Sequence, residues 1–338
     1  MNADCDLQES LRTKYNENVS SSATSNHICF CNRDVSIHYH DSAISELFQA
    51  SIRHLEMSSP AGSPDLEIFC FATDDSPRRW LQENELSIAI NQTMSHSFFR
   101  YCFQGHSLFA FDSLAKRAFY WVDTLSAFDF YRARPFTRIL SWYAEHHHLT
   151  WVHAACVGIS SGAVVIPSAG GSGKSTSAAA CLLSDLLFVG DDFVVLDKER
   201  LDVSSVYSNM MLSAKSIDLL RDFERVEILQ SKFQDKKEKD CYQLFEDFQQ
   251  QLEIRLPLRG ILVPEIVAGE SRIVPAKKDE AMRAFVSTLQ IGRILGLAPN
   301  PMLKDLHSIV QQLPTCKLEI GGDLGSIPPL ISQFLNRD

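Results

Sequence analysis

The chain has 338 residues, a length typical of about two domains that leaves room for a large buried core. Charged residues make up 22% of it, and 42 acidic against 32 basic side chains give a formal net charge of −10. This balance argues against a broad phosphate-backbone footprint, so nucleic acid is not expected as a partner.

The sequence also bears on the compartment. No stretch approaches the ~20 apolar residues that a membrane-spanning helix needs, and the first residues carry neither the basic region nor the apolar region of a secretory signal. The 9 cysteines have no framework spacing and their number is odd, which favours reduced thiols. We therefore expect a cytoplasmic protein with no membrane partner.

The N-terminal part divides into two stretches. Residues 1–26 are polar and end in the serine-rich run Ser20–Asn26, so they are expected to form a disordered tail. Residues 27–132 contain short runs of aromatic and β-branched residues, which are typical of strands, and residues 43–55 carry apolar side chains at helical spacing. This stretch is predicted to be a smaller α+β domain.

Residues 133–338 are expected to form the second domain. A helix is predicted over 135–145 and a strand over 150–157, and then the central motif of the chain follows. Beyond it the sequence predicts strands at 186–190, 193–196, 256–263, 271–275 and 316–320, a helix at 278–289 and a closing helix at 327–335. Helices and strands therefore alternate in this part of the chain, which predicts an α/β domain.

The central motif runs from Val164 to Thr176 and reads as an apolar strand, a glycine-rich loop and an alanine-rich helix. Its three glycines permit positive φ angles and bring backbone N–H groups close to an anion, and the helix N-terminus adds further free N–H groups. Lys174 can contact the β- and γ-phosphates, and the Ser175 hydroxyl can bind Mg²⁺. The predicted nucleotide-binding residues are Gly170, Gly171, Ser172, Gly173, Lys174, Ser175 and Thr176.

One position departs from the strict pattern of such loops. Ser168 stands where the pattern has its first glycine. Its hydroxyl can donate a hydrogen bond to a bound phosphate, or it can only tighten the turn.

Two adjacent carboxylates, Asp191 and Asp192, follow the apolar strand at 186–190. Successive strand residues point to opposite faces, so the two side chains are not expected to do the same job. One of them can reach Mg²⁺ and the other a substrate hydroxyl.

Several elements occur in a fixed order along residues 133–338. They are His153-Ala-Ala-Cys-Val-Gly158, the loop Gly170 to Thr176, Gly190-Asp-Asp-Phe-Val-Val195, Pro257-Leu-Arg-Gly260 and Leu313 to Gly321. This set resembles the HPr kinase/phosphorylase superfamily, and more narrowly the HPr-kinase-like proteins of peptide-modifying gene clusters, of the lasso-peptide precursor kinase type. The resemblance implies a P-loop α/β domain similar to the C-terminal domain of HPr kinase and the nucleotide domain of phosphoenolpyruvate carboxykinase.

The resemblance also implies roles for individual residues, with ATP and Mg²⁺ as cofactors. Lys174 would hold the β- and γ-phosphates, Asp191 would act as base on the acceptor hydroxyl, and Ser175 and Asp192 would bind the metal. His153 matches a histidine that approaches the phosphates. An arginine is also expected near the transferred group: Arg259 fits the Pro-Leu-Arg element, whereas Arg255 resembles a Glu-Ile-Arg element, so the choice between them stays open.

These observations predict an ATP- and Mg²⁺-dependent kinase that phosphorylates a serine hydroxyl of a peptide or small protein. A homo-oligomer is compatible with the sequence. Two alternatives remain at this point. The same site chemistry would serve a kinase of a small hydroxylated metabolite, and a regulatory module could bind ATP without transferring phosphate.

Overall fold

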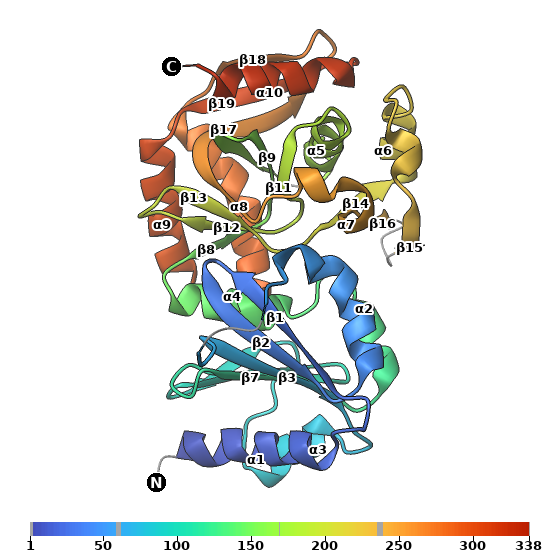
Figure 1. The fold of residues 1–338 in the computed structure, drawn as a ribbon. Coiled ribbons are helices and arrows are strands. Elements are labelled where there is room, and N and C mark those ends of the chain that lie inside the picture. Colours follow the sequence, from blue (N-terminus) through green and yellow to red (C-terminus); the bar gives the residue numbers. More distant parts are fainter. Residues whose placement is uncertain (1–2, 59–61, 169, 235–238, 338) are drawn as a thin grey trace. The chain divides into compact units, whose positions relative to one another are not determined.

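The computed structural model describes residues 3–58, 62–168, 170–234 and 239–337. The chain divides into two compact units (Figure 1): unit 1 comprises residues 1–147 with 294–297, and unit 2 comprises residues 148–293 with 298–338. Both have mixed α/β architecture. In the part of the chain that the structure describes, every helix is too short or too polar to span a membrane.

Unit 1 is built on a seven-stranded sheet, counted over the described residues. In sheet order its strands are β1 (Thr24–Phe30), β2 (Arg33–Tyr39), β3 (Leu66–Ala72), β7 (Arg117–Val122), β6 (Ser107–Asp112), β5 (Phe99–Gln104) and β4 (Thr93–His96). Strands β2, β3 and β7 pair in parallel, and the other neighbours are antiparallel. This part of the chain therefore forms a sheet of mixed strand direction.

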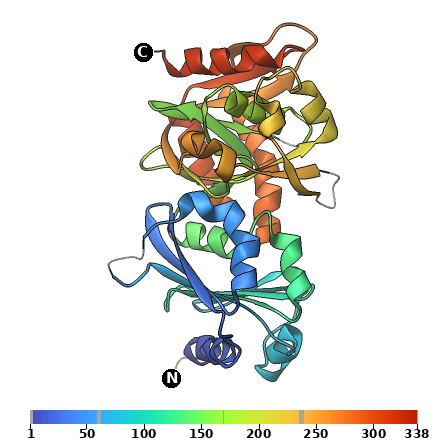
Figure 2. The ribbon, with the colours of Figure 1, turned by 45° about the vertical axis from the view of Figure 1, so that its right-hand side comes forward.

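Helices cover both faces of the unit 1 sheet. They are α1 (Ala3–Glu17), α2 (Ser42–Ile52), α3 (Pro77–Glu83) and α4 (Thr137–His146), with short 3-10 helices η1 (Arg53–Leu55) and η2 (Leu125–Tyr131). Figures 1 and 2 show α1 and α3 on one face of the sheet and α2 and α4 on the other. The sheet is therefore buried on both sides, which explains why its central strands β3, β7 and β6 are almost continuously apolar.

The expected disordered tail is wrong for most of its length. Residues 3–17 form α1, and Leu7, Leu11 and Tyr15 are buried in the core of unit 1. The ring of Tyr15 lies 5.1 Å from that of Phe69, centroid to centroid. Three apolar residues at i, i+4 and i+8 make one stripe of a helix, which is enough to pack a short helix on a sheet even when the segment is polar overall.

The expected domain boundary at residues 132/133 is also wrong, because α4 belongs to unit 1. Its side chains Ile139, Leu140 and Trp142 are fully buried, and its Tyr143 ring packs edge-on against Phe111 at 6.3 Å. The helical pattern was predicted correctly. The apolar stripe of an amphipathic helix, however, does not show whether the helix packs in the core of unit 1 or of unit 2.

Unit 2 is built on a nine-stranded sheet, again counted over the described residues. Its main path is β11 (Leu187–Gly190), β9 (Ala154–Ile159), β10 (Gly162–Pro167), β17 (Arg255–Ile266), β13 (Asp202–Ser205), β12 (Val194–Asp197) and β8 (Thr150–Val152). Strand β19 (Thr315–Ile320) pairs with β17, and β18 (Arg272–Pro275) pairs with β19. A separate three-stranded sheet consists of β14 (Asn209–Ser213), β16 (Lys239–Gln243) and β15 (Ser231–Gln234).

The strand directions define one edge of this sheet. Strand β17 runs parallel to β10 on one side and to β19 on the other. Strand β9 is antiparallel to both β10 and β11, so β11 also runs parallel to β10. The carboxyl ends of β11, β10, β17 and β19 therefore meet at the same edge, which is where open α/β sheets bind their ligands.

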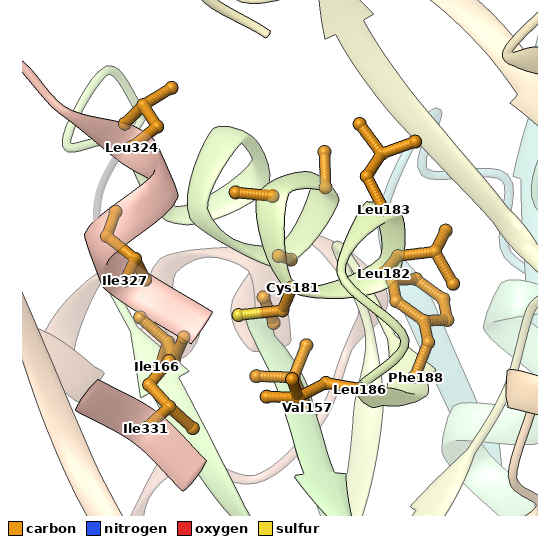
Figure 3. Packing of buried hydrophobic residues seen from close by; sticks show 14 of the residues in the cluster. Val157, Ile166, Cys181, Leu182, Leu183, Leu186, Phe188, Leu324, Ile327 and Ile331 are labelled. Carbon is orange, nitrogen blue, oxygen red and sulfur yellow. The ribbon is translucent and has the colours of Figure 1, made fainter. Parts of the chain in front are cut away.

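Alternate residues of β10 face opposite layers of helices. Val164 and Ile166 pack with α5 (Lys174–Leu183) and α10 (Ile327–Leu335), as Figure 3 shows for Ile166, Cys181, Ile327 and Ile331. Ala163 and Val165 pack with α8 (Lys278–Leu295) and α9 (Pro299–Gln312) on the other face. The remaining helices are α6 (Ala214–Leu219), α7 (Phe245–Phe248), η3 (Val226–Ile228), η4 (Gln249–Gln251) and η5 (Leu324–Ser326).

Candidate phosphate-binding site

The predicted strand, loop and helix are present in unit 2. Strand β10 ends at Pro167 and α5 begins at Lys174, and of the loop between them only Ala169 lies outside the described residues. Gly171 and Gly173 have φ angles of 86° and 91°, in the region that favours glycine. A Cβ atom on Gly173 would also lie 2.8 Å from Cδ1 of Ile320. The positive φ angle is therefore the main reason for glycine at this position, since the Cδ1 atom of Ile320 is the end of a side chain that can move.

Hydroxyl groups hold the two ends of the loop. The Ser172 hydroxyl donates to the Ser168 hydroxyl at 2.5 Å, and Ser168 is buried. Ser168, which stands where the pattern has glycine, thus links the start of the loop to Ser172 by this hydrogen bond. The Thr176 hydroxyl donates to the Ser216 hydroxyl of α6 at 3.1 Å. The sequence did not point to Ser216, because the contact spans 40 residues of chain.

The loop lysine and serine meet one carboxylate. Lys174 Nζ and Ser175 Oγ each lie 3.0 Å from the Oδ1 atom of Asp191. Lys174 is 5% exposed and Asp191 2% exposed, so this is a buried ion pair. The other oxygen, Asp191 Oδ2, is buried and has no hydrogen-bond partner among the described residues. A buried acceptor without a partner costs about 1–3 kcal/mol, so this oxygen is set to accept a further donor or a cation.

The carboxylate pair lies in a tight turn between β11 and β12. The Phe193 N–H donates to the Asp191 carbonyl at 2.9 Å, and Asp192 has a φ angle of 69°. The two side chains therefore separate because of this turn, and not because of the strand alternation that the sequence suggested. Asp191 contacts the loop, whereas Asp192 lies beside His153.

His153 lies between β8 and β9. Its Nδ1 atom donates to the Asp192 carbonyl at 2.6 Å and lies 3.9 Å from the Oδ1 atom of the same residue. Burial lowers the pKa of His153, and the nearby Lys174 charge lowers it further, against the opposing effect of the two carboxylates. The ring is therefore neutral near pH 7, with its proton on Nδ1 and an unprotonated Nε2. His153 therefore lies beside Asp192, and its predicted role near the phosphates stays a prediction.

Neither candidate arginine lies with these residues. Arg259 Nε donates to the Ser161 carbonyl at 3.3 Å, and its side chain covers Gly162. Parallel pairing places this part of β17 beside the start of β10, whereas the loop follows the end of β10. Arg255 lies still earlier in β17, where its Nη1 atom is 3.6 Å from Asp202 Oδ2. The expectation of Arg259 in the site is therefore wrong for this structure.

The donor set suits a hard divalent cation. Among the described residues no group of three or more His, Cys, Asp and Glu side chains could hold a metal ion by itself. Mg²⁺, however, keeps several waters and usually takes one or two carboxylates together with substrate phosphates. The Ser175 hydroxyl and the Oδ2 atom of Asp191 fit this demand, since the oxygen that Mg²⁺ would need has no competing hydrogen bond.

Comparisons with known proteins give a remote likeness to solved structures. No family model matches the chain, and no curated protein matches it. The solved structure of the HPr(Ser) kinase/phosphatase from Coxiella burnetii is similar over 55% of this chain and 93% of its own, with 13% sequence identity and a TM-score of 0.30. Values this low assign neither fold nor activity.

Proposed function

We propose that unit 2 is an ATP- and Mg²⁺-dependent kinase that transfers the γ-phosphate to a serine hydroxyl of a peptide or small protein. One observation carries the proposal: Lys174 and Ser175, at the start of α5, converge on a single buried carboxylate, Asp191. A helix N-terminus preceded by a glycine loop binds phosphate, and the lysine, hydroxyl and carboxylate supply what phosphoryl transfer needs beside it.

The nucleotide phosphates would lie over the loop. Positions Gly170 and Gly171 leave open space where a Cβ would stand, so backbone N–H groups can approach an anion closely. Lys174 is held at 3.0 Å from Asp191 and can exchange part of this contact for a phosphate oxygen. Ser175 and Asp191 would hold Mg²⁺, which would supply positive charge against the negative charge that develops during transfer.

The geometry favours roles for the two carboxylates that are the reverse of those expected from the sequence, in which Asp191 was the base and Asp192 the metal ligand. The side chain of Asp191 is 0% exposed and already compensates Lys174, which suits a metal ligand. The side chain of Asp192 is 12% exposed, so it is the more accessible of the pair to an incoming hydroxyl. We assign Asp192 as the base and Asp191 to the metal. His153 is a positioning residue, because it holds the Asp192 carbonyl.

The reaction then balances simply. The serine oxygen forms a bond to the γ-phosphorus, the bond between that phosphorus and the bridging oxygen of ATP breaks, and ADP leaves. The hydroxyl proton passes to the Asp192 carboxylate. A positioned base of this kind contributes about 10²- to 10⁴-fold to the rate.

The test is phosphate transfer from γ-labelled ATP with Mg²⁺ to a library of serine peptides, read by intact mass. Wild type should add one phosphate to a peptide serine. Asp192→Asn should lower transfer about 10²-fold or more and keep ATP affinity, whereas Asp191→Asn should weaken Mg²⁺-dependent ATP binding itself. Asp279→Asn is the matched control on α8 and should change neither.

Other outcomes would redirect the proposal. Transfer to small hydroxylated metabolites but to no peptide would establish a metabolite kinase. ATP binding without transfer to either class would establish a regulatory module. Loss of transfer in Asp191→Asn with unchanged ATP binding would restore Asp191 as the base and refute the division of labour.

A further inference from the structure

An exposed aliphatic side chain stands beside the phosphate loop. Ile266, the last residue of β17, is 64% exposed. Its cross-strand neighbour is Ile320, the last residue of β19. The Cγ1 atom of Ile266 and the Cδ1 atom of Ile320 lie 3.8 Å and 2.8 Å from the position of a Cβ on Gly173. We call these two side chains the isoleucine ledge. They extend an apolar surface directly from the loop residue that precedes Lys174.

The position of the ledge along the sheet edge is informative. From one side to the other, the strand ends at this edge come in the order β11, β10, β17 and β19, with antiparallel β9 between the first two. Asp191 and Asp192 follow β11, and the ledge ends β17 and β19. The carboxylates and the ledge therefore lie on opposite sides of the loop, with β19 two strand spacings, or about 10 Å, from β10.

A nucleoside triphosphate is polar at one end and flat and apolar at the other. The transferred γ-phosphate must lie near the carboxylates, so the nucleoside end must extend away from them. On the opposite side of the loop it meets the isoleucine ledge. A peptide acceptor, in contrast, must reach Asp192 with its hydroxyl, and so approaches from the other side.

We propose that Ile266 and Ile320 form the nucleobase-binding surface, against which the flat face of the adenine of ATP packs. This inference rests on the proposed function, since it presumes that the triphosphate lies over the loop. It explains why a large aliphatic side chain is exposed at this place. Ile320 is 5% exposed and forms the buried part of the ledge, whereas Ile266 is 64% exposed and supplies most of the contact area.

The test compares two ligands that differ only by the nucleoside. Mg-ATP and Mg-tripolyphosphate are titrated into the full chain as wild type, Ile266→Ser and Val286→Ser, the last being a matched control because Val286 on α8 is 47% exposed. Ile266→Ser should weaken ATP about 10-fold, the range expected for losing one apolar contact in a ligand site. The affinity for tripolyphosphate should stay unchanged, and the control should change neither.

Four results would overturn the inference. Equal losses for both ligands in Ile266→Ser would mean that the ledge only shapes the loop, and unchanged ATP affinity would mean that the base lies elsewhere; both leave the kinase proposal standing. A higher KM for the peptide with unchanged ATP affinity would assign the ledge to the acceptor. If wild type bound neither ligand in a Lys174-dependent way, the proposed function would fail and the ledge assignment with it.

Discussion

The buried ion pair between Lys174 and Asp191 offers the sharpest test of the site. Its atoms are 3.0 Å apart, and the two side chains are 6% and 0% exposed. Removing one partner of such a pair leaves an uncompensated buried charge, which typically costs 3–5 kcal/mol. Lys174→Met and Asp191→Asn should each lower the free energy of unfolding of unit 2 by about this amount.

The double variant should lose much less free energy of unfolding than the two single variants lose together. It removes both charges, so neither is left buried without compensation. We expect a coupling of at least about 2 kcal/mol between the two positions. Ser175→Ala is the matched control, because it removes a neutral hydroxyl donor from the same Asp191 oxygen and should cost only about 1 kcal/mol.

Unfolding of unit 2 can be followed separately from that of unit 1 by thiol labelling. Cys156 and Cys181 in unit 2 are fully buried, and burial raises the pKa of both thiols, so they should react only when unit 2 opens. Cys102, buried in unit 1, provides an internal reference. Peptide-resolved labelling across a urea series then gives the free energy for each variant. If the double variant lost as much free energy of unfolding as the two single variants together, the interpretation of this contact as a charge pair would be refuted.

Three further outcomes are expected. Gly173→Ala should cost about 1–3 kcal/mol because its φ of 91° is strained for alanine, and it should abolish ATP binding in a direct titration. Leu11→Ala, at a fully buried position of α1, should cost about 2–5 kcal/mol in urea unfolding of unit 1. Burial lowers the pKa of His54 from 6.5 to about 3. Between these pH values His54 binds a proton in the unfolded chain but not in the folded chain. Stability should therefore fall as the pH drops below 6.5, by up to about 1.4 kcal/mol per pH unit, and His54→Leu should remove this contribution from urea curves at pH 7 and 5.

The part of the site that could be predicted is the part that local geometry fixes. Glycines, a helix start and the order Gly173-Lys174-Ser175 determine one another within a few residues, because the loop must turn with positive φ before the helix can begin. The carboxylates were found for a similar reason, since the apolar strand β11 ends directly before Asp191 and so delivers it to a sheet edge.

The failures share a different cause. Arg259 was assigned from its neighbours in sequence, but the register of β17 against β10 placed it at the wrong end of the strand. The boundary near residue 132 and the tail over residues 1–26 failed because packing partners far along the chain decide where α4 and α1 lie. Ile266 drew no attention, since only the pairing of parallel strands brings it beside Gly173.

The turn that carries the two carboxylates shows how one dipeptide can provide two environments. With a φ angle of 69°, Asp192 stands in a conformation that glycine adopts more easily. Strain of this kind costs of order 1–3 kcal/mol and persists where the surroundings over-determine it. The kink turns Asp191 into the interior, where Lys174 neutralises it, and leaves Asp192 beside His153 with its side chain partly exposed. Glycine would be less strained at this position than aspartate. The presence of aspartate is best explained by a function of its carboxylate, and the proposed base is such a function.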